Sequence, residues 1–170
     1  TGTKYETKLI SGIYEILVNR TGAEIMQKNL ETLGEITYTK DEINYANTIL
    51  KESDKPQIGL NGKVTPLQET LPAQGGSTDV GDVSQVVPTI RMSATVAADG
   101  GPWHSWAVVA CTGMSIGHKG MIYAAKALSM TMADLYKNPK LVEAVKNDYK
   151  KNKSSKPYKP RILPGPPSLE

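Results

Sequence analysis

The sequence has no phenylalanine, a single cysteine and two histidines among its 170 residues. Tyrosine, methionine and the two tryptophans must therefore fill the large positions of its core. The lone Cys111 excludes an internal disulfide and fits a reducing, cytoplasmic environment; it lies in an apolar run, which indicates a buried small side chain rather than a nucleophile. His104, His118 and Cys111 show no HxxxH, CxxC or HxxE spacing, so any metal ligand among them needs partners elsewhere.

Two further absences limit the class of protein. No apolar run approaches the ~20 residues that a membrane span needs, and a net charge of +3 does not by itself indicate a nucleic-acid partner. A hydrophobic share of 39% and a charged share of 22% suit a globular chain with its own core. The lysines between residues 146 and 159 then indicate a solvated helix end rather than a binding patch.

The first 39 residues predict a small sheet with one covering helix. Residues 3–18 alternate weakly as one or two strands, and residues 35–39 form another short strand. Between them, apolar residues at three- and four-residue spacings predict a helix over 22–33 that ends at Gly34. The predicted order is therefore β-β-α-β.

The remaining chain predicts an alternation of helices and strands. A loop is predicted over 51–74, and three short apolar runs predict buried strands, at 83–87, 89–96 and 106–111. Caps and helical spacing predict helices from Asp41 to before Ser53, from Ser115 to about Lys137, and from Pro139 to about Lys150. The residues that share one face of the second of these helices are Met121, Ala124, Ala125, Leu128, Met132 and Leu135.

The segment from Gly75 to Trp106 holds the least ordinary chemistry, in two loops. His104 follows a Gly-Gly-Pro turn, which suits a metal-binding or catalytic role on a loop. Trp103 and Trp106 on either side of it would shield it from water or cover the edge of the core. In the other loop, Asp79 and Asp82 either support a ligand or satisfy their own backbone in Asx turns. The amides of 75–78 could form an anion-binding concavity, although the pattern is not a P-loop.

These motifs together resemble the metal-dependent aminoacylase and carboxypeptidase G family. GGSTDVGDVS resembles that family's glycine-Thr-Asp loop, and GGPWHSW resembles the segment with its last metal-binding histidine. The resemblance is closest to the aminobenzoyl-glutamate hydrolase subgroup, through the motifs STDVGDVS, His-Ser-Trp and GHKGM. It covers roughly residues 5–150. The resemblance implies an α/β fold: an α/β/α catalytic domain with two zinc ions, or manganese in their place, and a ferredoxin-like lid that mediates homodimer formation.

The resemblance also implies a division of this chain. Residues 1–39 would end the lid, 40–152 would be the C-terminal part of the catalytic domain, and 153–170 would be a proline- and lysine-rich tail. The tail closes on Leu-Glu, a common remnant of a purification tag, and the chain begins without methionine, so we expect a fragment. Its missing partner would be the N-terminal part of the parent chain, which carries the other metal ligands and the general-base glutamate.

Site roles follow from the same resemblance. His104 matches the last metal ligand, and the candidate substrate-binding residues are Arg20, Asn19, Thr78 and Asp79. Arg20 suits a substrate carboxylate, although a surface arginine is the simpler interpretation. We expect the chain alone to bind zinc weakly and to lack hydrolase activity toward N-acyl amino acids. The alternatives are a non-catalytic binding or oligomerisation module, and a small enzyme that uses His104 and Asp79 as an acid–base pair.

Overall fold

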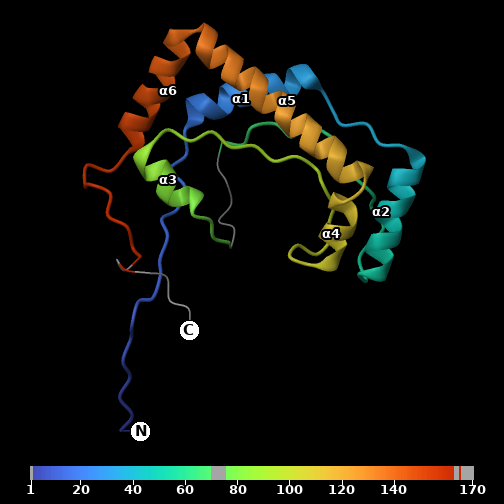
Figure 1. Cartoon of the computed structure of the whole chain (residues 1–170), viewed down its shortest axis with the longest axis horizontal. Helices are drawn as coiled ribbons and strands as arrows, with labels where there is room; N and C mark the ends of the chain where they lie inside the picture. Colours follow the sequence, from blue (N-terminus) through green and yellow to red (C-terminus); the bar gives the residue numbers. More distant parts are fainter. Residues whose placement is uncertain (1, 70–75, 163–164, 166–170) are drawn as a thin grey trace.

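The computed structural model describes residues 2–69, 76–162 and 165, and these residues form six α-helices joined by extended chain (Figure 1). In chain order the helices are α1 (Arg20–Leu33), α2 (Lys40–Glu52), α3 (Val80–Val86), α4 (Trp106–Thr112), α5 (Ser115–Lys137) and α6 (Pro139–Asn152). None of the helices in this part of the chain combines the length and apolarity of a membrane span.

The long helices α1 and α5 pack side by side and form the centre of the molecule (Figure 1). At one end, α4 packs against α5 and α2 packs against α4. At the other end, α6 packs against both α1 and α5, and the Tyr149 hydroxyl of α6 donates to the carbonyl of Gln85 in α3 at 2.8 Å. The described part of the first 39 residues, 2–39, therefore packs on the rest of the chain through α1.

Local sequence sets the ends of these helices, and the predicted helices are confirmed to within a few residues. Asn19 caps α1, because its Oδ1 accepts from the amide of Gly22 at 2.8 Å, and Gly34 ends the helix with a φ of 73°. The cap of α2 is Thr39 rather than the expected Asp41, in a capping box with Glu42. Pro139 opens α6 as expected.

The apolar core lies where α2, α4 and the start of α5 meet. Cys111 is fully buried there, which confirms the prediction that it is a small interior side chain. The buried members of this cluster are Ala46, Ile49, Leu50, Ala98, Ala107, Cys111 and Ile116. The core therefore supports the end of the molecule that carries the loop before α4.

The predicted α/β fold is wrong for this chain, because the described residues contain helices and no strand. A strand needs a neighbouring strand that completes its ladder of hydrogen bonds. The extended segments here either lie against helices or share an isolated hydrogen bond with another extended segment. Tyr14 and Leu17 donate their amides to side chains of α3, Asp82 Oδ2 at 3.2 Å and Ser84 Oγ at 2.8 Å. Ile36 donates one amide to the carbonyl of Gly62. The ferredoxin-like order β-β-α-β is therefore reduced to α1 between extended segments.

Two predicted strands are helices instead. The valines at 80, 83 and 86 recur at helical spacing, and they follow the Thr78-Asp79 turn as α3. Residues 106–112 form α4, which buries Ala107 and Cys111, four residues apart, on one face. A short apolar run cannot be assigned to strand or helix by its periodicity alone. In the structure α4 packs as a helix against α5.

Helix α5 turns its small residues inward and its large ones outward. The side that packs against its neighbours buries Gly117, Gly120, Ala127 and Thr131 together with Ile116. Met121, Leu128 and Met132 are exposed instead, although their spacing marks them as an apolar face. Gly117 and Gly120 give room to the backbones of Thr112 and Thr95. A hydrogen bond from Asn29 Nδ2 to Thr131 Oγ1 at 3.1 Å joins α1 to α5.

A Gly120→Ala substitution is expected to destabilise the fold by about 2 kcal/mol, although alanine favours helices over glycine. A Cβ at this position would lie 2.3 Å from the carbonyl oxygen of Thr95 and 2.7 Å from Cγ1 of Val96. Urea denaturation measures the effect. Gly113→Ala is the matched control, because its Cβ would meet nothing closer than 3.6 Å; equal effects of the two substitutions would contradict the prediction.

The tail after α6 folds back on the N-terminal segment. The Tyr158 hydroxyl donates to Asp82 Oδ1 at 2.8 Å, and the Tyr14 hydroxyl donates to the carbonyl of Lys159 at 3.0 Å. Arg161 lies over the Tyr14 ring at 4.6 Å. Residues 153–162 are thus attached to α3 through Asp82, whereas the predicted tag remnant at 169–170 lies outside the described residues.

Candidate functional site

His104 lies on a tight loop between the extended chain and α4. Gly100 has a φ of 72°, and His104 has a φ of 57°, one of two positive values among the non-glycine residues described. Such a conformation costs on the order of 1 kcal/mol and is uncommon outside glycine, although histidine tolerates it better than most residues. The loop is held by the Ser105 hydroxyl, which donates to the carbonyl of Pro102 at 2.6 Å.

The side chains around His104 form a shallow apolar depression. Its volume is about 410 Å³, and it is lined by Trp103, His104, Ser105, Trp106, Val108 and Val109. Trp103 and Trp106 are largely exposed, at 68% and 54% of their surface, so they do not seal the imidazole from water. The predicted shielding of His104 by the two tryptophans is therefore absent in this conformation of the chain.

The residues present do not fit a complete zinc site. Zinc takes three or four ligands from histidine, cysteine and carboxylates. Within residues 2–69, 76–162 and 165, no three such side chains lie close enough together to hold a metal ion. Cys111 is buried in the core, and His118 is exposed on the first turn of α5. His104 therefore stands as a single candidate donor.

Arg20 lies at the start of α1 and already has anionic partners. Its Nε donates to Glu24 Oε1 at 3.0 Å, and one terminal nitrogen donates to Glu69 Oε1 at 2.9 Å. The other terminal nitrogen donates to the carbonyl of Gln68 at 2.9 Å. The hydrogen bond to Glu24 raises the pKa of Arg20 further. A substrate carboxylate would have to replace Glu69 to reach this guanidinium.

Asn19 is buried, and both polar atoms of its side chain make hydrogen bonds within the fold. Besides capping α1, it donates from Nδ2 to the carbonyl of Val145 in α6 at 2.9 Å. Its amide therefore links the first helix to the last one. This placement gives Asn19 a structural task at a position where the sequence suggested contact with substrate.

Thr78 and Asp79 lie where the chain enters α3. The Thr78 hydroxyl accepts from the amide of Val80 at 3.3 Å, as in a local turn. Asp79 occupies the N-cap position of α3, but its side chain makes no capping hydrogen bond. Gly75, which would begin the anion-binding concavity, lies outside the described residues.

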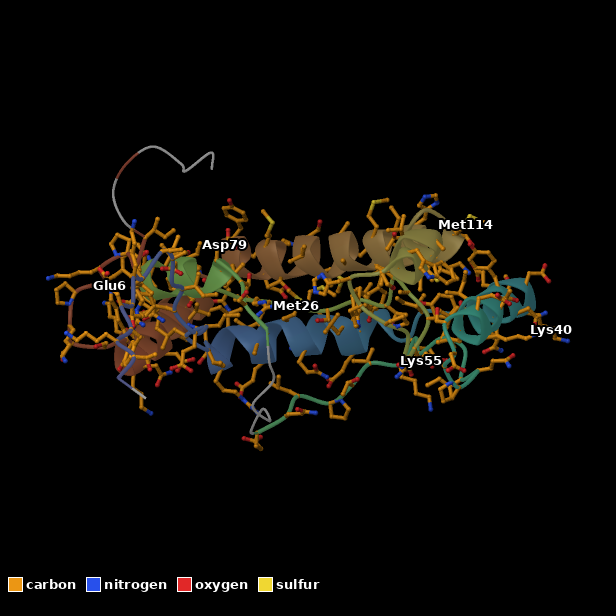
Figure 2. All side chains as sticks on the ribbon, turned by 90° about the horizontal axis from the view of Figure 1, so that it is seen from below. Glu6, Met26, Lys40, Lys55, Asp79 and Met114 are labelled. Carbon is orange, nitrogen blue, oxygen red and sulfur yellow. The ribbon has the colours of Figure 1, made fainter. Side chains whose placement is uncertain are left out.

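The structure separates the candidates into two groups. Figure 2 labels Asp79 near the C-terminal end of α5 and Met114 at the opposite end, where α4 joins α5. The end of the molecule that carries α3 and α6 also holds four of the candidates, Asn19, Arg20, Thr78 and Asp79 (Figure 1). His104 precedes α4 at the other end, so the structure does not bring it to Asp79 as the predicted acid–base pair requires.

One polar cluster near the His104 end was not predicted from the sequence. Glu42 Oε1 accepts from Ser115 Oγ at 2.6 Å, and Oε2 accepts from Lys119 Nζ at 2.6 Å and from the Thr39 amide at 2.7 Å. Burial alone would raise the pKa of Glu42, but the hydrogen bonds from Lys119, Ser115 and Thr39 outweigh burial and lower the pKa to about 2. The GHKGM motif, which contains Lys119, was the available signal.

The cluster fixes α2 against the start of α5. Lys119 Nζ also donates to the carbonyl of Thr37 at 3.0 Å and lies 5.5 Å from the centre of the Tyr38 ring. On the next turns of α2, the Tyr45 hydroxyl donates to the carbonyl of Ala110 in α4 at 3.2 Å. The helix that follows His104 is therefore held in place by α2 from one side and α5 from the other.

Comparison with known proteins finds a distant relative of this chain among the hydrolases. The relative is one of the subunits of p-aminobenzoyl-glutamate hydrolase from Escherichia coli (strain K12), and it is 29% identical over 183 residues. The similarity covers 93% of this chain but 38% of the relative, so the chain spans well under half of the relative's length. No family model matches the chain, and no solved structure matches it.

Proposed function

We propose that this chain is the C-terminal portion of a metal-dependent amidohydrolase subunit that cleaves the amide bond of N-acyl amino acids such as p-aminobenzoyl-glutamate. The observation that carries the proposal is the relationship to a hydrolase subunit along 93% of the chain. The motifs around Thr78 and His104, which suggested the same class of enzyme, lie inside this related stretch.

His104 is the residue that we assign to the metal, with zinc as the preferred ion and manganese as the alternative. The residue is exposed on the loop before α4, where its backbone has a φ of 57°, so its imidazole is open to a ligand. The described residues do not place two further donors beside it to complete a group of three. The complete site then depends on protein outside this chain, and we expect the chain alone to bind zinc weakly and not to hydrolyse the amide.

For the substrate, Arg20 has the most suitable chemistry of the candidates. A guanidinium binds a carboxylate through two parallel hydrogen bonds, and the Glu69 carboxylate now occupies one terminal nitrogen of Arg20. Because Arg20 and His104 lie at different ends of this structure, they would serve different substrate molecules or different parts of an assembled dimer. Homodimer formation and a cytoplasmic location belong to the same proposal.

A non-catalytic docking module is the second candidate function. It is favoured by the number of large apolar side chains on the surface of α5, including Met121, Leu128 and Met132. This function does not need an active site in the chain.

A chimeric hydrolase separates the two functions. We expect the E. coli relative, with its related 38% replaced by this chain, to hydrolyse p-aminobenzoyl-glutamate in the presence of the rest of that hydrolase. Released p-aminobenzoate measures the rate, and the isolated chain serves as the inactive control. A soluble, folded chimera without any hydrolysis would favour the docking module, and hydrolysis by the isolated chain would refute the fragment proposal.

A further inference from the structure

A continuous apolar stripe lies on the outer side of α5. Its large side chains are about half exposed or more: Met121 at 58%, Leu128 at 45%, Met132 at 54% and Tyr136 at 83% of their surface. With the exposed Ala125, they follow one another at three- and four-residue intervals, which places them on one face of the helix. Figure 2 shows side chains standing on the outer side of α5 with no other helix above them.

The stripe is distinct from the face that α5 uses inside this fold. Packing against α1, α4 and α6 engages the side with Gly117, Gly120, Ala127 and Thr131. A helix that is apolar on both sides is normally buried on both sides. Scattered exposed apolar residues are ordinary, but a contiguous stripe on a monomer marks an interaction surface.

Further exposed apolar side chains lie on the short helix α4, which packs against α5. Met114, immediately before α5, is exposed, and so are Trp106 and Val109 on α4. Trp106 and Val109 also line the depression that contains His104. A partner that covers the stripe and extends over α4 would therefore reach the imidazole that lacks further donors.

The unpaired charges of α5 are lysines beside the stripe. Lys119 is paired with Glu42, and Asp134 accepts from Asn29 on the inner side of α5 at 2.9 Å. The remaining charged residues of α5 are the exposed Lys126 and Lys137. Lys126 and Lys137 lie to one side of the stripe rather than within it, so a partner with carboxylates at the edge of an apolar surface would be complementary to them.

We propose that the outer face of α5, continued by Trp106 and Val109 of α4, is the docking surface for the part of the hydrolase that lies outside this chain. The relative's length supports this occupant, because 38% of that protein is matched here and the larger share is not. The inference rests on the proposed function. It predicts that the covering segment is apolar, with carboxylates facing Lys126 and Lys137.

The test compares paired substitutions in the chimera and in the isolated chain. Leu128→Glu with Met132→Glu is expected to lower the thermal unfolding midpoint of the chimera by about 5 °C or more, and to leave that of the isolated chain nearly unchanged because both side chains are exposed. The matched control is Val83→Glu with Val86→Glu, since these valines are equally exposed on α3. The control pair is expected to have little effect in either protein.

Several outcomes would overturn the proposal. One is an unfolding midpoint of the chimera that Leu128→Glu with Met132→Glu leaves unchanged, and another is an equal fall of the midpoint in the isolated chain. A third is a discrete dimer of the isolated chain that the same two substitutions dissociate. If the chimera does not accumulate, the same glutamates at the aligned positions of the E. coli relative give the same decision. A chimera that is inactive but selectively destabilised by the α5 pair would refute the proposed function and support the docking surface.

Discussion

Replacing His104 by asparagine in the chimeric hydrolase is expected to reduce hydrolysis of p-aminobenzoyl-glutamate by at least about 100-fold, the loss that even outer-shell partners of a metal can cause. Asparagine tolerates the positive φ of this position. The substitution therefore removes the imidazole while it keeps the loop. Initial rates of p-aminobenzoate release measure the activity, and elemental analysis of the purified protein measures the bound zinc.

His118→Asn is the matched control for this experiment. His118 is the other histidine of the chain, exposed on the first turn of α5, so its replacement tests the general effect of losing an imidazole. We expect it to change activity and zinc content by no more than a few-fold. Full activity of the His104→Asn chimera would show that His104 is not a ligand, whatever the control does.

Replacing Glu42 by alanine is expected to lower the free energy of unfolding of the isolated chain by about 2 to 3 kcal/mol. The substitution removes the capping-box hydrogen bond from the Thr39 amide and the hydrogen bonds from Ser115 and Lys119, and it leaves Lys119 without its carboxylate partner. The Lys119 side chain is 36% exposed, so solvent reduces the contribution of the ion pair. Urea denaturation followed by circular dichroism measures the loss.

The Glu42 contribution is also expected to depend on pH. Folding lowers the pKa of Glu42 from its ordinary value of 4.5 to about 2, although burial acts in the opposite direction. A depressed folded pKa means that this stabilisation is fully present above about pH 4.5 and is lost as the pH falls toward 2. Glu42→Gln should therefore flatten the pH dependence of stability in this window.

Asp41→Ala provides the comparison for both measurements. Asp41 is exposed and lies beside Glu42 in the first turn of α2, but the capping box and the contacts to α5 belong to Glu42. Its loss is expected to cost only a few tenths of a kcal/mol, the usual effect of one acidic residue near a helix N-terminus. Similar losses for Asp41→Ala and Glu42→Ala would rule out the tertiary role of Glu42.

The four longer helices, α1, α2, α5 and α6, could be predicted because their signals are local. The residues that begin or end a helix form their hydrogen bonds or set the backbone within one turn of it, as Asn19 and Gly34 do for α1 and the Asn138-Pro139 pair does for α6. The separation of the candidate site residues could not be predicted. Thr78 and Asp79 precede His104 by about 25 residues of sequence, and nothing in that sequence fixes which end of α5 each loop reaches.

The sequence by itself determined the caps and bounds of the main helices, the interior position of Cys111, and the motifs that indicate a hydrolase. These depend on hydrogen bonds within a few residues and on the chemistry of single side chains. Only the tertiary structure decided that the predicted strands are unpaired extended chain or, at α3 and α4, helices, and that α5 buries its glycines and Ala127. The physical reason is that a ladder, or a buried helix face, requires a partner surface, and the described residues supply one for the small side of α5 but none for its methionines.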